Sequence, residues 1–126
     1  MNASEKEVFI VKCGKRYLFL DLSSIDLIQA EGNYVRVFLS KDKYLVREKL
    51  SEIEKRLQNA NFVRISRSVV VNIKSIRELQ HKRPCNIEVT LHNRQRYVMT
   101  RKYRQNLNII LGKDINSSRT LHEKTG

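Results

Sequence analysis

The residues with the clearest capacity for chemistry lie in the stretch Phe62–Asn72, whose sequence is FVRISRSVVVN. Within it the pentapeptide RISRS, residues 64–68, joins two arginines to two serines immediately before the apolar run Val69–Val71. An arginine side chain presents a planar fork of donors that matches a guanine edge or a phosphate, and neighbouring hydroxyl groups can orient it. We therefore expect RISRS to form a cationic turn at the end of a β-core. This chemistry favours a nucleic-acid ligand over catalysis.

A second cationic group, Arg101, Lys102 and Arg104, opens the last segment with helical periodicity. Thr100 is a suitable N-cap for this helix, and Gly112 stands where a helix often stops. Cations at the positive end of a helix dipole each cost about 0.3 to 1 kcal/mol when exposed. An anionic ligand would offset this cost, because the dipole and the free amide groups of a helix start favour phosphate. The apolar stripe of the helix consists of Tyr103, Leu107, Ile110 and Leu111.

The charge of the chain is large and unevenly distributed. Lys and Arg number 25 against 13 Asp and Glu, which gives a formal net charge of +12. Residues 1–60 contribute 11 basic and 9 acidic side chains, whereas residues 61–126 contribute 14 and 4. Asymmetry of this kind favours a polyanionic partner over an evenly solvated surface. Charge alone does not distinguish DNA from RNA, heparin or an anionic membrane.

The length of 126 residues suits one domain with one modest core. We place this domain at residues 8–112, between a lead-in of residues 1–7 and a polar segment, residues 113–126, that we expect to be a disordered tail. No apolar run approaches the roughly 20 residues that span a bilayer, and the start lacks the features of a secretory signal, so we expect a cytoplasmic protein. Cys13 and Cys85 have no ligand-like spacing; we expect them reduced, at a strand end and in a loop respectively.

Alternation of apolar residues predicts a mainly β fold with one or two short helices. The expected strands are residues 8–12, 17–21, 25–30, 34–39, 44–47, 69–73, 76–80, 87–91 and 97–99. The first half resembles a β-meander. The expected turns are Gly14-Lys15, Glu31–Asn33, Lys41–Lys43, His81–Pro84 and His92–Arg94.

A helix is predicted between the two halves, because Leu50, Ile53 and Leu57 recur at spacings of three and four. Ser51 and Glu54 have the capping-box pattern and predict a start at Ser51. Lys49 is a poor N-cap, since it cannot accept a hydrogen bond from the free amide groups.

Five segments together resemble the LytTR family of bacterial DNA-binding domains, over about residues 8–111. The resemblance implies an elongated, β-rich fold of antiparallel sheets in a response-regulator effector domain of a two-component system. It further implies a transcriptional regulator that inserts loops, not a recognition helix, into successive major grooves of promoter repeats. The segments are IDLIQAEGNYV (Ile25–Val35), VREKL (Val46–Leu50), FVRISRS (Phe62–Ser68), VVN (Val70–Asn72) and TRKY (Thr100–Tyr103).

The resemblance carries over three base-contacting positions, which are Asn33, Arg67 and Arg101. From the residues alone, Asn33 can pair with adenine or hold an Asx turn, Arg67 can contact DNA or form an ion pair, and Arg101 can be a solvated helix end. We expect phosphate contacts or supporting roles for Arg64, Ser66, Thr100, Lys102 and Arg104.

Two departures from the family pattern concern Ser66, where many members have His, and Lys49, where a hydroxyl N-cap is usual. A receiver domain is absent from the sequence, which fits either a free-standing regulator or an excised effector domain. The expected partners are double-stranded promoter DNA, a second copy on repeated sites and RNA polymerase, with no membrane and no small-molecule substrate. We expect no metal and no cofactor.

Other functional classes remain as alternatives. An enzyme is disfavoured, because His81, His92 and His122 fall in expected turns or the tail with no catalytic partner nearby. An RNA-binding module is the stronger alternative, although the aromatic residues it would need fall mostly at expected core positions. These aromatics are Tyr17, Phe19, Tyr34, Phe38 and Tyr97. A basic protein that binds nucleic acid without sequence preference is the third hypothesis.

Overall fold

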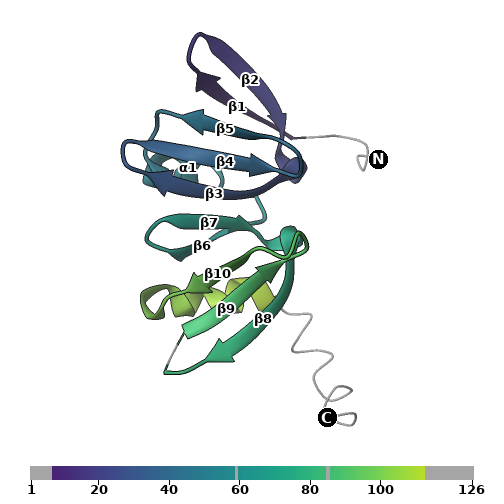
Figure 1. Ribbon diagram of the computed structural model, residues 1–126, viewed down its shortest axis with the longest axis vertical. Coiled ribbons are helices and arrows are strands. Elements are labelled where there is room, and N and C mark those ends of the chain that lie inside the picture. Colours follow the sequence, from purple (N-terminus) through teal and green to yellow (C-terminus); the bar gives the residue numbers. More distant parts are fainter. Residues whose placement is uncertain (1–6, 59, 85, 113–126) are drawn as a thin grey trace.

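The computed structural model describes residues 7–58, 60–84 and 86–112. Within these residues ten strands form three antiparallel sheets, stacked along the long axis of an elongated molecule (Figure 1). The strands are β1 Val8–Cys13, β2 Arg16–Asp21, β3 Ile25–Glu31, β4 Tyr34–Leu39, β5 Lys43–Val46, β6 Phe62–Ser66, β7 Val69–Asn72, β8 Ile76–Lys82, β9 Asn86–Leu91 and β10 Arg96–Met99. The predicted mainly β, elongated fold of antiparallel sheets is confirmed.

The central sheet has five strands in the order β5-β4-β3-β7-β6, and both of its faces are buried. On one face Ile28 and Val70, which are register partners, join a core beneath the helix α1 (Leu50–Arg56). On the other face Leu27 and Val71, also partners, join a second core shared with β9 and β10. Burial on both faces explains the unbroken apolar run Val69–Val71 of β7, since a half-solvated strand would alternate with polar residues.

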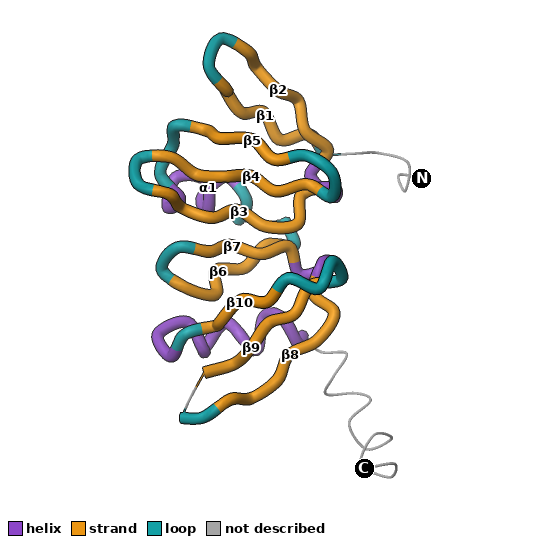
Figure 2. Tube along the Cα trace, viewed as in Figure 1, coloured by secondary structure: helices purple, strands orange, loops and turns teal. Residues whose placement is uncertain are grey.

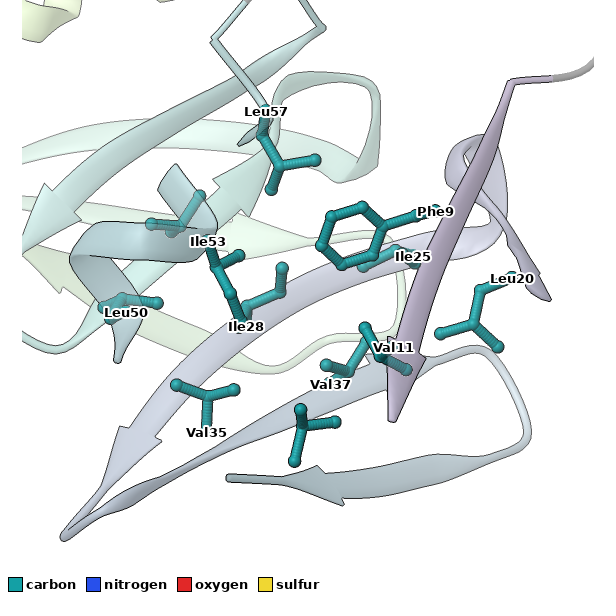
Figure 3. Packing of buried hydrophobic residues seen from close by; sticks show 12 residues of the cluster. Phe9, Val11, Leu20, Ile25, Ile28, Val35, Val37, Leu50, Ile53 and Leu57 are labelled. Atoms are coloured by element: carbon teal, nitrogen blue, oxygen red, sulfur yellow. The ribbon is translucent and has the colours of Figure 1, made fainter. Parts of the chain in front are cut away.

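Helix α1 begins at Leu50, so the predicted start at Ser51 is wrong. Lys49 is the N-cap and makes no side-chain capping hydrogen bond. Figure 3 shows Ile53 of the helix pointing toward Ile28 of β3, and Ile53 is completely buried. Packing of the stripe Leu50, Ile53 and Leu57 therefore sets the helix start, because tertiary burial stabilises a short helix more than a cap does.

The pentapeptide RISRS is not one continuous turn, which corrects the prediction from the sequence. Strand β6 continues through Ser66, and only Arg67 and Ser68 form the turn to β7. Ile65 is fully buried in the second core, between two half-buried polar neighbours. The strand alternation of Val63 and Ile65 was hidden by the charged residues around it.

The hairpin β1–β2 turns at Gly14-Lys15, as predicted, and Cys13 ends β1. Phe9, Val11 and Leu20 face the core on its inner side. Its outer side exposes Tyr17 and Phe19, at 63% and 69% of their surface. The prediction that the aromatic residues are mostly core is therefore wrong for these two and for Tyr34, which is also exposed.

The C-terminal part begins with the sheet β10-β9-β8 and ends in a 3₁₀-helix, η4 (Arg101–Asn106), continued as α-helix over residues 107–112. Thr100 is the N-cap of η4, but its side chain makes no capping hydrogen bond. Leu107 and Ile110 pack against the second core, whereas Leu111 is exposed. His81 lies in β8, not in a loop. Cys85, His122, the expected tail and most of the lead-in lie outside the described residues.

Candidate nucleic-acid interface

The turns that carry Asn33 and Arg67 lie next to each other on one edge of the central sheet, by which we mean the end where its strands turn and not an outermost strand. Asn33 is in the turn between β3 and β4, and Arg67 is in the turn between β6 and β7. Because β3 pairs with β7, the end of β3 meets the start of β7, and the Ala30 amide donates to the Ser68 carbonyl at 2.8 Å. Figure 2 shows both turns at the left side of the molecule.

Arg101 reaches the same edge through a contact between two sheets. The amide of Thr100, at the end of β10, donates to the Ile65 carbonyl of β6 at 3.0 Å. The first residue of η4 therefore lies beside the end of β6, next to the turn that holds Arg67 (Figure 1). The structure thus brings the three predicted base-contacting residues together on one edge, which we call the reading edge, in the order Asn33, Arg67, Arg101.

The side chains of these three residues are exposed and unbonded. No hydrogen bond or ion pair of Asn33, Arg67 or Arg101 side chains occurs within the part of the chain that the structure describes. Neither the Asx turn at Asn33 nor the ion pair at Arg67 is formed. Free donors at the tips of rigid hairpins are positioned for an external ligand, since loops on a rigid scaffold are the usual place for binding residues.

Arg64 holds the Arg67 turn in place from beneath. Its Nη1 donates to Glu54 Oε1 of α1 at 2.7 Å, its Nε donates to the Ser66 carbonyl at 2.8 Å, and its Nη2 donates to the Arg67 carbonyl. Only 13% of the Arg64 side chain is exposed. Most of its donors are therefore engaged inside the protein, and its geometry favours the supporting alternative over phosphate contact.

Two further contacts support the same turn, and one of them was not expected from the sequence. The Ser66 hydroxyl accepts from the Ser68 amide at 3.3 Å, which fits the supporting role expected for Ser66. Asn106, in η4, donates from Nδ2 to the Arg64 carbonyl at 2.8 Å and so ties η4 to β6. The sequence offers no local signal for Asn106 or Glu54, because both partners are distant along the chain.

The Asn33 turn is clamped by an ion pair at its base. Arg36 donates from Nε and Nη2 to the two carboxylate oxygens of Glu31, at 2.6 and 2.9 Å. These hydrogen bonds hold the pKa of Glu31 below its ordinary value and the pKa of Arg36 above its own. Sequence reasoning missed this pair, because Arg36 reaches diagonally across the hairpin: its register partner on β3 is Gln29, whereas Glu31 pairs with Tyr34.

The start of η4 adds a cationic surface beside Arg101. Lys102 and Arg104 are exposed, and the Lys102 ammonium lies 5.9 Å from the centre of the Tyr103 ring. The Arg64 guanidinium also lies over the Tyr103 ring, 5.6 Å from its centre. Tyr103 therefore links the surface cations of η4 to the arginine that supports the neighbouring turn.

Residues 7–58, 60–84 and 86–112 contain no cluster of three or more His, Cys, Asp or Glu side chains able to hold a metal ion. No helix within these ranges has the length and apolar character needed to cross a bilayer.

Comparison with known proteins places this geometry in a family. The family model of the LytTr DNA-binding domain matches residues 15–112. The sensory transduction protein LytR of Staphylococcus saprophyticus is 23% identical over 106 residues, which cover 84% of this chain and 42% of that protein. LytT of Bacillus subtilis is 34% identical over 67 residues, covering 53% of this chain and 28% of that protein.

The fold has a counterpart among solved structures. The LytTr DNA-binding domain of a putative methyl-accepting/DNA response regulator from Bacillus cereus superposes with a TM-score of 0.74 at 20% identity, covering 86% of this chain and 99% of that one. At this identity the likeness shows the fold alone. The matched family model spans most of the chain, and the chain therefore belongs to the LytTR family of DNA-binding domains.

Proposed function

We propose that this protein binds double-stranded promoter DNA in a sequence-specific manner, with Asn33, Arg67 and Arg101 contacting base edges. The observation that carries the proposal is the alignment of these three exposed, unbonded side chains on one edge. Arginine pairs bidentately with guanine and asparagine with adenine in the major groove. Their positions on separate, rigidly held turns allow each side chain to address a different base pair.

A second layer of contacts would set affinity rather than selectivity. Lys102 and Arg104 are exposed beside Arg101 and are suited to neutralise phosphates. Arg64, Ser66 and Thr100 would act as supports, because their hydrogen bonds fix the Arg67 turn and join η4 to β6. If roughly six phosphates are contacted, affinity should fall by orders of magnitude between low and moderate salt.

The spacing of the turns limits how they meet the duplex. Two strand spacings separate the Asn33 turn from the Arg67 turn, which amounts to about 10 Å. One turn of the duplex is about 34 Å long, so these two neighbouring turns do not lie in successive major grooves. Arg101 lies beside the Arg67 turn, so Asn33 and Arg101 are the most widely separated of the three residues, and we assign to them the two ends of the contacted segment, with Arg67 between them.

The regulatory role is part of the same proposal. The chain spans 42% and 43% of the two LytR relatives it matches, so their whole activity is not transferred by the match itself. The printed name of these relatives, sensory transduction protein, supports a role as the effector half of a two-component regulator in the cytoplasm. Two copies on a repeated site, and contact with RNA polymerase, would complete that role.

The test compares specific with scrambled duplexes. A selected duplex is first obtained by enrichment of random DNA on the full chain. Arg67→Ala and Arg101→Ala should each lose about 1 to 3 kcal/mol of specific binding and relax selectivity at one base position. Arg77→Ala, which removes an exposed arginine from β8, is the control and should bind like the wild type. Equal loss on specific and scrambled DNA in every variant would disprove base contact.

One observation favours a different nucleic acid as a second candidate. Tyr17 and Phe19 are both exposed on the outer face of β2, and Lys12 lies 5.7 Å from the centre of the Tyr17 ring. Exposed aromatics on a basic β-surface are the usual platform for stacking unpaired bases. Competition between labelled duplex and single-stranded RNA of equal length distinguishes the candidates, and Phe19→Ser should weaken only the RNA complex.

A further inference from the structure

A second group of cations lies on the reading edge, in the half of the chain with little net charge. Lys15 and Arg16 are exposed at the turn of the β1–β2 hairpin, and Arg47 and Lys49 are exposed between β5 and α1. We call these four residues the N-terminal basic strip. In the net charge of residues 1–60 the strip is masked, because 9 acidic side chains offset 11 basic ones there.

Contacts between neighbouring strands place the strip next to Asn33. The start of β4, which follows the Asn33 turn, pairs with the end of β5 through Val35 and Val46. The end of β5 in turn touches the end of β1, where the Cys13 thiol donates to the Leu45 carbonyl at 3.3 Å. Figure 1 shows the β1–β2 turn, the end of β5 and the β3–β4 turn along the same side.

The four strip residues differ from Arg36 and Arg56, the other arginines of the first half, in having no carboxylate partner within the described residues. Arg36 is paired with Glu31, and Arg56 is paired with Glu48 at 3.1 Å and also donates to the Ile10 carbonyl. None of the four strip residues forms an ion pair with a carboxylate in residues 7–58, 60–84 or 86–112. The carboxylate nearest to them in sequence, Glu48, is already bound by Arg56.

We propose that the N-terminal basic strip binds the phosphate backbone of the same duplex, beyond the base pair addressed by Asn33. This inference rests on the proposed function and extends its contact surface. One to two strand spacings, about 5 to 10 Å, separate the end of β5, which Arg47 follows, from the Asn33 turn. Since base pairs rise about 3.4 Å along each strand, Arg47 and Lys49 meet phosphates up to about three base pairs further on, and Lys15 and Arg16, on the separate β1–β2 sheet that contacts β5, meet those beyond.

The test uses two duplexes and two double variants of the full chain. One duplex ends at the selected site, and the other carries six further base pairs on the side that Asn33 faces. That side is found by extending the site on each side in turn and measuring which extension raises the affinity of the wild type. The variants are Lys15→Ala/Arg16→Ala and Arg47→Ala/Lys49→Ala. A matched control, Lys41→Ala/Lys74→Ala, removes two exposed lysines from the opposite edge, in the β4–β5 turn and after β7. Circular dichroism confirms that each variant is folded.

The wild type should bind the extended duplex more tightly than the short one, and each strip variant should lose that gain. The slope of log affinity against log salt should fall by about two for a strip variant on the extended duplex, one for each phosphate contact removed. The ratio of specific to scrambled binding should stay unchanged, because the strip carries no base contact. The control should keep both the gain and the slope.

Two results would overturn the inference. These are equal losses in the strip and control variants, or no loss in the strip variants. Failure of the proposed function has a different signature, since a wild type without sequence preference would still show the strip-dependent salt slope on any duplex of sufficient length.

Discussion

The reading edge and the opposite side of the molecule, where strands of all three sheets also turn, use their polar side chains in opposite ways. On that opposite side, Asp21, Asn72 and Asn93 each accept a hydrogen bond from an amide two residues later, at 3.1, 3.0 and 2.9 Å. On the reading edge, Lys49 and Thr100 occupy N-cap positions without a side-chain capping bond, and Asn33 makes none. The opposite side is stabilised by its own turn side chains, whereas the reading edge has one such contact, at Ser66, among the described residues and leaves Asn33, Lys49 and Thr100 without one.

This difference separates stability from binding within one small domain. Asx-type caps are worth about 0.5 to 2 kcal/mol each, so a chain selected for stability alone would place them at every turn. On the reading edge the turns are instead held from beneath, by Arg64 on Glu54 and by Arg36 on Glu31. The supports are buried or set back from the tips, which keeps the tips rigid without using their side chains.

The largest effect is expected in the core that both edges share. Val70→Asp and Leu50→Asp should each unfold the domain, because Val70 is 1% exposed and Leu50 is 5% exposed, and an unpaired charge there is costly. Thermal melts followed by circular dichroism measure this. If either variant melts like the wild type and still binds DNA, the core is not the element that holds the two edges together.

The next effect contrasts two asparagines on opposite edges. Asn72 is 2% exposed and donates from Nδ2 to the Ile25 carbonyl at 2.8 Å. Asn72→Ala should therefore lower the free energy of unfolding by about 1 to 3 kcal/mol, since it leaves that carbonyl unsatisfied. Asn33→Ala should leave unfolding unchanged and weaken discrimination at one base pair. Chemical denaturation and duplex titration are run on both variants. A loss of stability in Asn33→Ala together with a loss of discrimination in Asn72→Ala would contradict the comparison.

A smaller effect is expected at the support of the Arg67 turn. Arg64→Met should lower the free energy of unfolding by about 1 to 2 kcal/mol and weaken binding to specific duplex, because the turn loses three hydrogen bonds. Arg67→Met, three residues further on, should change binding alone. Glu54→Gln keeps an acceptor for Arg64 and serves as the milder control. Unchanged stability in Arg64→Met would show that the turn does not depend on this arginine.

The smallest effect concerns pH and the clamp at the Asn33 turn. The hydrogen bond from Arg36 lowers the pKa of Glu31 from its ordinary value of 4.5, so the ion pair is intact above that value and is lost as pH falls through the lowered pKa. Selectivity at the Asn33 position should therefore stay constant from about pH 8 to about pH 5. Glu31→Gln should reduce it at every pH. If selectivity at this position instead changed with a midpoint near neutral pH, a group other than Glu31 would control the turn.

Much of the fold was predictable because its signals are local. Alternating apolar residues and turn sequences located the strands of the β1–β2 and β3–β4 hairpins, and spacings of three and four located the stripe Leu50, Ile53 and Leu57. The errors have one physical origin, which is that burial is decided by distant partners. Ile65 was assigned to a turn because its charged neighbours obscured its face, and Tyr17 and Phe19 were assigned to the core because an apolar residue does not reveal which side of a hairpin is covered.

The sequence by itself determined the family, the order of the elements apart from β6, and the residue types available for DNA contact at Asn33, Arg67 and Arg101. Only the tertiary structure decided that these residues share one edge, because that depends on the pairing of β3 with β7 and on the contact of Thr100 with Ile65. It also decided which arginines are free. Arg64 and Arg67 are equally basic in the sequence, but Glu54 of the preceding helix, ten residues away, engages the first and leaves the second exposed.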